Sequence, residues 1–249
     1  MKMVALVPAR AGSKRIPGKN LKLLAGHPLL RYAIASAQES GIFSDVIVSS
    51  EHDPTLKLAR EYGARPMWCS TAVAHRDTSA DICWVRYTLN RLRDRGEEPD
   101  TFAILRCTSP FRTARTIQRA YKQFTLPDQT ADTLRAVEPV SQHPAKMWQQ
   151  VHGECGPIKP LLDGSSPDGT PWHSSPTQSL PRYYVQNASL EMTWSYVVRS
   201  YDRITGKKIA AFFTEGYEGF DLNTPADWRE AEYLIASGQA TLPEIHVAA

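Results

Sequence analysis

The chain has 249 residues, of which 42% are apolar and 22% are charged, and its formal net charge is +3. This balance is typical of a globular protein and excludes wholesale disorder, and no apolar run approaches the roughly 20 residues that span a bilayer. The net charge is too small to indicate nucleic-acid binding by itself.

The cysteines and the N-terminus indicate the compartment. Four cysteines are irregularly spaced and form no CxxC pair, which argues against a structural zinc site and favours reduced thiols. The chain enters an apolar run at Val4 without the pattern of a secretory signal. We therefore expect a cytoplasmic protein with neither a membrane nor a nucleic acid among its partners.

Apolar runs and amphipathic stretches alternate along most of the chain. The first run, Val4–Val7, ends at Pro8 and predicts a buried parallel strand. In chain order, the pattern then predicts a helix over 28–40, a strand over 45–49, a helix over 53–63 capped by Asp53, a strand over 66–69, a helix over 78–95, a strand over 101–105, a helix over 114–124, strands over 133–137, 190–198 and 209–214, and a final helix over 225–237. This alternation indicates an α/β fold with a doubly wound, mostly parallel sheet.

The alternation breaks after Glu138. From Pro139 to Pro181 the sequence is rich in Pro, Gly, Ser, Trp and His and has no helical period. A segment of this length is too long for an idle loop in a compact domain. We therefore predict a single domain over 1–249 with an excursion over about 139–190 that carries substrate contacts or a subunit contact.

A basic, glycine-containing loop follows the first strand. Gly12 and Gly18 would let the backbone approach a phosphate closely and expose its N–H groups. The cations that could neutralise a triphosphate are Arg10, Lys14, Arg15 and Lys19. The spacing is not that of a Walker A loop, because five residues separate the glycines and Asn20 follows the lysine. The alternative to a phosphate site is a solvated basic turn.

The residues of this loop, PARAGSKRIPGKN, resemble the signature P-A-R-x-G-S-K-x-I-P-x-K-N of the acylneuraminate cytidylyltransferases, which are CMP-sugar-acid synthetases. Further segments resemble this family in the same order along the chain. They are Asp77-Thr78-Ser79, Leu105–Arg112, His143–Lys146 and Asp221–Trp228. The shared order makes the resemblance specific and extends it through most of the chain.

The resemblance implies a Rossmann-like nucleotidyltransferase that transfers CMP from CTP to the anomeric hydroxyl of an acidic 2-keto sugar. It also implies a Mg²⁺ cofactor, a homodimer, and catalysis by Arg10, Lys19 and Asp221. The nucleotide contacts it implies are Ala9, Arg10, Gly12, Ser13, Lys14, Lys19, Asn20, Arg76 and Ser79, although Ser79 also fits a plain helix N-terminus. The sugar contacts it implies are Arg106, Thr108, Ser109, Lys146, Gln186 and Asn187.

The acidic segment near the C-terminus is the candidate metal site. Asp221 follows a predicted strand and turn. Its carboxylate oxygens are hard ligands, which suit Mg²⁺. The family pattern has a second aspartate where this chain has Asn223, which could donate a carbonyl oxygen but no charge. Asp227 fits a capping partner for the final helix better than a catalytic role.

The sugar side also departs from the family pattern. Arg106 replaces a glutamine and could approach the sugar directly. The carboxylate of the sugar would be the natural partner of its guanidinium. Val185 stands near an expected arginine and Glu191 near an expected tyrosine. The sequence therefore allows a nonulosonic acid other than ordinary sialic acid.

Two further functions stay open from the sequence. A nucleotide-sugar-dependent glycosyltransferase also combines a nucleotide fold with acidic metal ligands, but a sugar diphosphate needs less positive charge than the loop offers. A catalytically weak or inactive nucleotide-binding homologue is prompted by Asn223.

Overall fold

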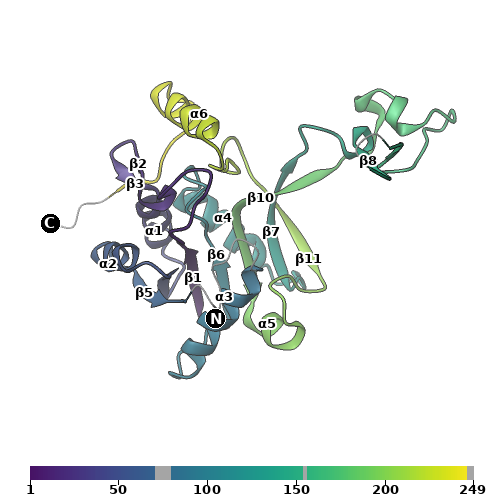
Figure 1. Ribbon diagram of the computed structural model, residues 1–249. Coiled ribbons are helices and arrows are strands. Elements are labelled where there is room, and N and C mark those ends of the chain that lie inside the picture. Colours follow the sequence, from purple (N-terminus) through teal and green to yellow (C-terminus); the bar gives the residue numbers. More distant parts are fainter. Residues whose placement is uncertain (71–79, 154–155, 246–249) are drawn as a thin grey trace. The chain divides into compact units, whose positions relative to one another are not determined.

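The computed structural model describes residues 1–70, 80–153 and 156–245 of the chain (Figure 1). These residues gather into two compact units, one formed by 1–136 and 187–249 and the other by 137–186. The second unit covers most of the excursion that the sequence predicts over about 139–190. The assignment of the whole chain to a single domain stays a prediction.

A seven-stranded sheet forms the centre of the first unit. Its strands are β1 (Met3–Pro8), β4 (Asp45–Ser50), β5 (Arg65–Trp68), β6 (Thr101–Ile104), β7 (Thr133–Pro139), β10 (Tyr184–Trp194) and β11 (Ile209–Phe213). Their order across the sheet is β11-β7-β10-β6-β1-β4-β5. β6, β1, β4 and β5 pair in parallel, and β10 is antiparallel to β6. The expected doubly wound, mostly parallel sheet is confirmed.

Helices cover both faces of this sheet (Figure 1). The helices are α1 (Leu29–Glu39), α2 (Asp53–Glu61), α3 (Asp81–Arg93), α4 (Ala114–Phe124), α5 (Ser195–Tyr201) and α6 (Pro225–Ala236). Buried side chains of α1, α2, α4 and α6 share one core cluster, and those of α3 and α5 share the other. β1 lies between the two layers, so its apolar run is buried on both faces, as a central parallel strand requires. Among the described residues, no helix is both long enough and apolar enough to cross a lipid bilayer.

The structure corrects three expectations about element bounds. β10 begins at Tyr184, six residues before the predicted start, and residues 195–198 are helical although the sequence predicts a strand there. Val197 and Val198 are both buried. Strand alternation would place these neighbours on opposite faces, whereas a helix lets both point inward. Asp53 is the first residue of α2, and His52 occupies the N-cap position instead.

The second unit is built from short elements. They are η2 (Pro144–Lys146), β8 (Trp148–Gln150), β9 (Ile158–Pro160), η3 (Trp172–Ser174) and η4 (Thr177–Ser179), and β8 and β9 form a two-stranded antiparallel sheet. His143 ties the unit together, because its ring accepts a hydrogen bond from the Ala145 N–H at 3.1 Å and contacts the Pro181 carbonyl at 2.8 Å. Several large apolar side chains of this unit stay exposed, including Trp148, Ile158 and Leu161.

Asp132 is an internal anchor for the segment between α5 and β11. Its carboxylate accepts hydrogen bonds from the Tyr196 hydroxyl and from the backbone N–H groups of Lys207 and Lys208. The Tyr196 bond is the main reason that the pKa of Asp132 lies below its ordinary value. Gly206 allows this approach, because a Cβ added there would lie 2.1 Å from the Asp132 Cβ.

A methyl group at position 206 is therefore expected to destabilise the protein. Gly206→Ala forces Asp132 away from its backbone donors, and overpacking of this kind costs about 1–3 kcal/mol. The free energy of unfolding from a urea titration measures the loss. Gly12→Ala is the stability control, because a Cβ at Gly12 meets no heavy atom within 4 Å. Equal stability of the two variants would contradict the close approach.

Candidate active site

The loop that leaves the carboxyl end of β1 closes back on itself. Asn20, in η1 (Lys19–Leu21), is buried, and its Nδ2 donates to the Arg10 carbonyl at 2.9 Å. Gly18 precedes η1 with φ of +62°, a left-handed conformation that glycine adopts without strain. The carboxyl edge of a parallel sheet is where α/β proteins bind ligands. The predicted phosphate loop therefore begins at the right edge and has a defined shape.

Lys19 joins this loop to the segment that carries Asp221. Its Nζ donates to the Leu222 carbonyl at 2.5 Å. Burial lowers the pKa of Lys19 below its ordinary value, and the neighbouring cations act in the same direction, against the opposite effect of the Asp221 charge. One of these cations is Arg10, so Arg10, Lys19 and Asp221 share one electrostatic environment. The three residues predicted to be catalytic are therefore brought together.

The Asp221 segment is docked against the turn that follows β6. The Leu222 N–H donates to the Thr108 carbonyl at 2.8 Å. The Asn223 side chain donates to Asp221 Oδ2, and Asn223 Oδ1 lies 3.5 Å from an Arg15 guanidinium nitrogen. Asp221 Oδ1 is buried and has no hydrogen-bond partner among the described residues.

This orphaned carboxylate oxygen is the feature that fits a hard cation. A buried anionic oxygen without a donor is costly, and a divalent ion would satisfy it. Within the described ranges, no group of three His, Cys, Asp or Glu side chains could enclose a metal. A Mg²⁺ ion here would take one carboxylate from the protein and its other ligands from phosphates and water, as is usual for this ion in nucleotide enzymes.

Asp227 is occupied by helix capping, as the sequence predicts. Its Oδ2 accepts the backbone N–H groups of Asn223 and Thr224, and its own N–H donates to the Thr224 hydroxyl. Burial alone would raise the pKa of Asp227, but these backbone donors hold the pKa below its ordinary value. The cap also fixes the backbone just after Asp221.

Arg106, the first residue of interest after β6, is paired with an aspartate that the sequence did not single out. Its guanidinium forms an ion pair with Asp81, the first residue of α3. Burial opposes ionisation of Asp81, but the charge and hydrogen bond of Arg106 hold its pKa below the ordinary value. Arg10 contributes to the same effect. An aspartate in the first turn of a helix is favoured by the helix dipole, so its position in the sequence gives no sign of a second role.

A buried arginine, Arg112, holds the turn after β6 against β10. Arg112 is 1% exposed, and it donates to the backbone carbonyls of Arg106 and Ser189. Burial lowers its pKa to about 10. The two hydrogen bonds that Arg112 donates therefore connect the turn after β6 to β10. Ser109, a predicted sugar contact, is itself buried at 2% exposure.

The remaining predicted residues fall into four groups, which are the loop, the first unit, the second unit and the residues outside the described ranges. In the loop, Ala9 is buried, Ser13 is half-buried, and Gly12 and Lys14 are exposed. Asn187 belongs to the first unit, and its Nδ2 donates to the Thr214 hydroxyl at 2.9 Å.

Two predicted sugar contacts, Lys146 and Gln186, belong to the second unit. The Lys146 ammonium donates to the carbonyls of His173 and Ser175, which uses two of its three donors. Arg76 and Ser79, with the rest of the Asp77-Thr78-Ser79 motif, lie outside the described residues.

Comparison with known proteins shows the family to which the chain belongs. A family model described as Cytidylyltransferase matches residues 4–145, more than half of the chain. A CMP-N,N'-diacetyllegionaminic acid synthase of Legionella pneumophila is 29% identical over 252 residues, which span 97% of this chain and 100% of that protein. A pseudaminic acid cytidylyltransferase of Campylobacter jejuni is 32% identical over 124 residues, 50% of this chain and 53% of that protein.

The fold is shared with a solved nucleotidyltransferase. A structure of CMP:2-keto-3-deoxy-manno-octonic acid synthetase complexed with CTP superposes with a TM-score of 0.66 at 15% identity, over 96% of this chain and 100% of that one. This likeness shows the Rossmann-like fold, while the family model spans the strand β1, its basic loop and the turn after β6. Together with the matched loop and turn, these findings place the chain in the cytidylyltransferase family.

Proposed function

We propose that this cytidylyltransferase transfers CMP from CTP to the anomeric hydroxyl of an acidic 2-keto sugar of the nonulosonic class and releases pyrophosphate. The observation that carries the proposal is the Lys19 bond to Leu222, which brings a phosphate-binding cation beside the Asp221 carboxylate. The full-length match to a CMP-legionaminic acid synthase supports the reaction class.

In this reaction the sugar hydroxyl oxygen forms a bond to the α-phosphorus of CTP. The bond from that phosphorus to the oxygen bridging the α- and β-phosphates breaks, pyrophosphate leaves with the bonding electrons, and the hydroxyl proton passes to water. Negative charge builds up on the departing pyrophosphate, so fixed cations are the main requirement. Arg10 and Lys19 supply these cations from a loop whose backbone is held in place by Asn20.

The cofactor that fits is Mg²⁺, held by Asp221 with Asn223 as its neighbour. Such an ion would neutralise phosphate charge and polarise the reacting phosphorus. Asn223 donates its amide to Asp221 Oδ2, so it orients the carboxylate and leaves Oδ1 for the cation. One charged protein ligand is sufficient for an ion that keeps several waters.

The acceptor we propose is a nonulosonic acid other than ordinary sialic acid. Glu191, near the position of a family tyrosine, is buried and pairs with Arg135 at 2.5 Å and with the Thr205 hydroxyl. Burial raises the pKa of Glu191 even in this pair. A charged network where the family pattern has a neutral ring favours a sugar with different substituents, such as the acids named for the relatives.

Pyrophosphate release is the direct test of this function. The protein is incubated with CTP, Mg²⁺ and a panel of legionaminic, pseudaminic, neuraminic and 3-deoxy-octulosonic acids, and pyrophosphate and CMP-sugar are measured. One acid should give stoichiometric amounts of both products. Release of a nucleoside diphosphate from a nucleotide sugar would instead support the glycosyltransferase. CTP binding without turnover of any acid would support the inactive homologue.

The same proposal includes a homodimer formed through the second unit. Ile158, the first residue of β9, is 58% exposed, and Leu161, which follows β9, is 50% exposed. Burying such side chains against a second copy would remove them from water. We expect a dimer mass in light scattering and a monomer for Ile158→Glu. Leu126→Glu, at an exposed leucine of the first unit, is the control that should stay dimeric. A monomer of the unaltered protein would contradict the proposal.

We also propose that the protein acts in the cytoplasm, on CTP and a small acidic sugar, without a membrane or nucleic-acid partner. Among the described residues, the three cysteines are free thiols, which suits a reducing compartment. Burial raises the pKa of Cys69 to about 11 and that of Cys107 to about 12, so both stay unreactive.

A further inference from the structure

The residues at the end of β4 hold the start of the phosphate loop. The Ala9 N–H donates to the Ser49 carbonyl at 2.9 Å, and the Ser50 hydroxyl donates to the Ala9 carbonyl at 2.7 Å. Glu51 continues this series, because its Oε1 accepts the Ala11 N–H at 2.8 Å. Three consecutive residues of one strand end therefore bind the residues on both sides of Arg10.

The backbone on either side of the Arg10 side chain is thereby fastened. The Arg10 carbonyl accepts from Asn20, and the Ala11 carbonyl accepts the Ser13 N–H at 2.8 Å. With the bonds of Ser50 to the Ala9 carbonyl and of Glu51 to the Ala11 N–H, the two peptide units around the Arg10 Cα are held from the end of β4 and from η1. The direction in which a side chain leaves the backbone is set by these units, so the base of the Arg10 side chain is fixed before any ligand arrives.

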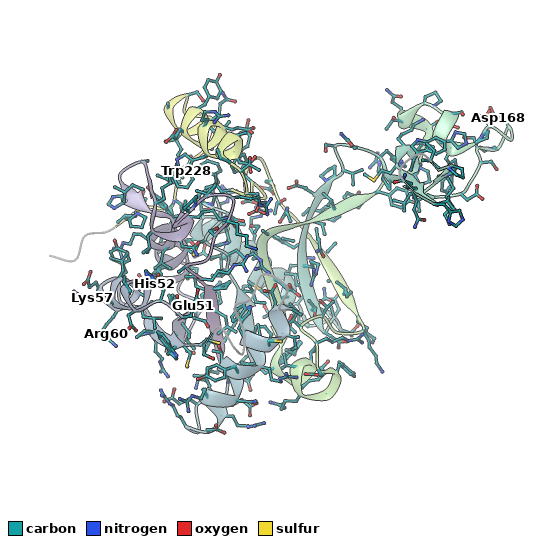
Figure 2. The ribbon with its side chains drawn as sticks, viewed as in Figure 1. Glu51, His52, Lys57, Arg60, Asp168 and Trp228 are labelled. Atoms are coloured by element: carbon teal, nitrogen blue, oxygen red, sulfur yellow. The ribbon has the colours of Figure 1, made fainter. Side chains whose placement is uncertain are left out.

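The position of Glu51 is unexpected on electrostatic grounds. A carboxylate near a triphosphate repels it, so an acidic residue directly beside a phosphate loop should weaken CTP binding. Glu51 is half-buried and lies immediately before His52, the N-cap residue of α2 (Figure 2). A hydrogen bond from a backbone N–H to a carboxylate is stronger than one to a neutral acceptor. The unfavourable effect of the Glu51 charge on CTP binding is outweighed if the hydrogen bond between Glu51 and Ala11 is needed to shape the loop.

We propose that Glu51 is a positioning residue, which binds the Ala11 N–H and so aims the Arg10 guanidinium at the phosphates of CTP. This role rests on the proposed function only in taking CTP as the ligand of the loop. Glu51 itself touches no substrate in this account. It acts through Ala11 and Arg10, and it engages the Ala11 N–H, which is then not available to the ligand.

The test separates the hydrogen bond from the charge. Glu51→Gln keeps an oxygen acceptor at the same place and removes the charge, whereas Glu51→Ala removes both. Thr55→Val is the matched control. It breaks the contact between the Thr55 hydroxyl and the His52 ring, 3.0 Å apart on the same turn, and does not touch the loop. Melting temperatures are measured first, so that only folded variants are compared.

Calorimetry with CTP alone gives the primary result. Glu51→Ala is expected to weaken CTP binding by roughly 10-fold or more, the size of a lost hydrogen bond to a charged group. Glu51→Gln is expected to bind within about 3-fold of the unaltered protein, and Thr55→Val likewise. In turnover, Glu51→Ala should lower kcat/KM for CTP and leave the KM of the sugar unchanged.

Three outcomes would overturn the proposal. Normal CTP binding by Glu51→Ala shows that the bond is not needed. Equal weakening by Glu51→Gln and Glu51→Ala shows that the charge matters and not the Ala11 bond. Equal weakening by Thr55→Val assigns the effect to the turn as a whole. Failure of the proposed function is seen separately, because the unaltered protein would then bind no CTP or release no pyrophosphate.

Discussion

Asp221→Asn is expected to reduce Mg²⁺-dependent pyrophosphate release by roughly 100- to 1,000-fold, because it removes the only carboxylate proposed to hold the ion. The buried Oδ1 of Asp221 accepts no hydrogen bond from the described residues, so this oxygen is available to bind a cation. The volume of the side chain is unchanged, and the fold should persist. Initial rates at a series of Mg²⁺ concentrations measure the loss.

Two neighbouring substitutions make this result specific. Asn223→Asp adds a second carboxylate at the position where the family pattern has one, and it should lower the Mg²⁺ concentration that gives half-maximal rate. Asp227→Asn is the control, because that carboxylate is engaged by the backbone N–H groups of the α6 cap. It should reduce stability and leave the Mg²⁺ dependence unchanged. If Asp221→Asn keeps normal turnover, Asp221 is not the metal ligand.

The sequence predicted the centre of the sheet because β1, β4 and β6 are buried almost throughout. An apolar run such as β1 has only one stable environment in a protein of this size, and the helices that connect β1, β4, β5 and β6 require parallel pairing of these four strands. Thr224 and Asp227 were predictable for a similar reason. The capping box depends on residues three positions apart, so it can be recognised without knowledge of the fold.

The pairing of Arg106 with Asp81 could not be predicted in this way. The two residues are 25 positions apart and approach each other only when α3 and the end of β6 are in place. The same holds for Glu51, whose contact with Ala11 spans 40 positions. Both acidic residues stand at or just before a helix N-terminus, where acidic residues are common for local reasons. The local sequence therefore accounts for both residues and gives no sign of a partner across the site.

The strand predicted over 190–198 is confirmed for residues 190–194 and wrong for residues 195–198, because the termination of β10 is also non-local. Ser195 donates its N–H to the Asp100 carbonyl at 2.9 Å, at the start of β6, and the chain turns there into α5. Val197 and Val198 are β-branched and favour strands in isolation. Their burial on α5 provides more stabilisation than the propensity for a strand would, as is common when tertiary packing opposes local preference.

Lys19→Met is expected to lower kcat/KM for CTP by roughly 100-fold or more, because it removes a partly buried cation beside the phosphates. Methionine is unbranched and only one heavy atom shorter than lysine, so most of the packing in the loop is preserved. Lys22→Met is the matched control. Lys22 is exposed, and its ammonium lies 4.1 Å from the centre of the ring of Trp228, a residue of α6 that Figure 2 labels. Loss of the Lys22 ammonium should change kcat/KM for CTP by less than about 3-fold.

The lowered pKa of Lys19 adds a pH dependence that distinguishes its charge from its hydrogen bond. A lysine whose pKa is depressed by burial loses its proton at a lower pH than an exposed lysine does. The value of kcat/KM reports groups in the free enzyme, so it should fall on the alkaline side below the pH at which ordinary lysines titrate. Lys19→Arg keeps the charge at all such pH values, because guanidinium does not deprotonate there.

In that variant the alkaline fall should disappear even if the rate at neutral pH is reduced. An unchanged alkaline fall in Lys19→Arg would assign the titration to another group and would leave Lys19 a purely structural contact of Leu222. The two substitutions therefore test different properties of one side chain. Lys19→Met tests whether a cation is needed at this place, and Lys19→Arg tests whether the proton on Lys19 limits turnover as the pH rises.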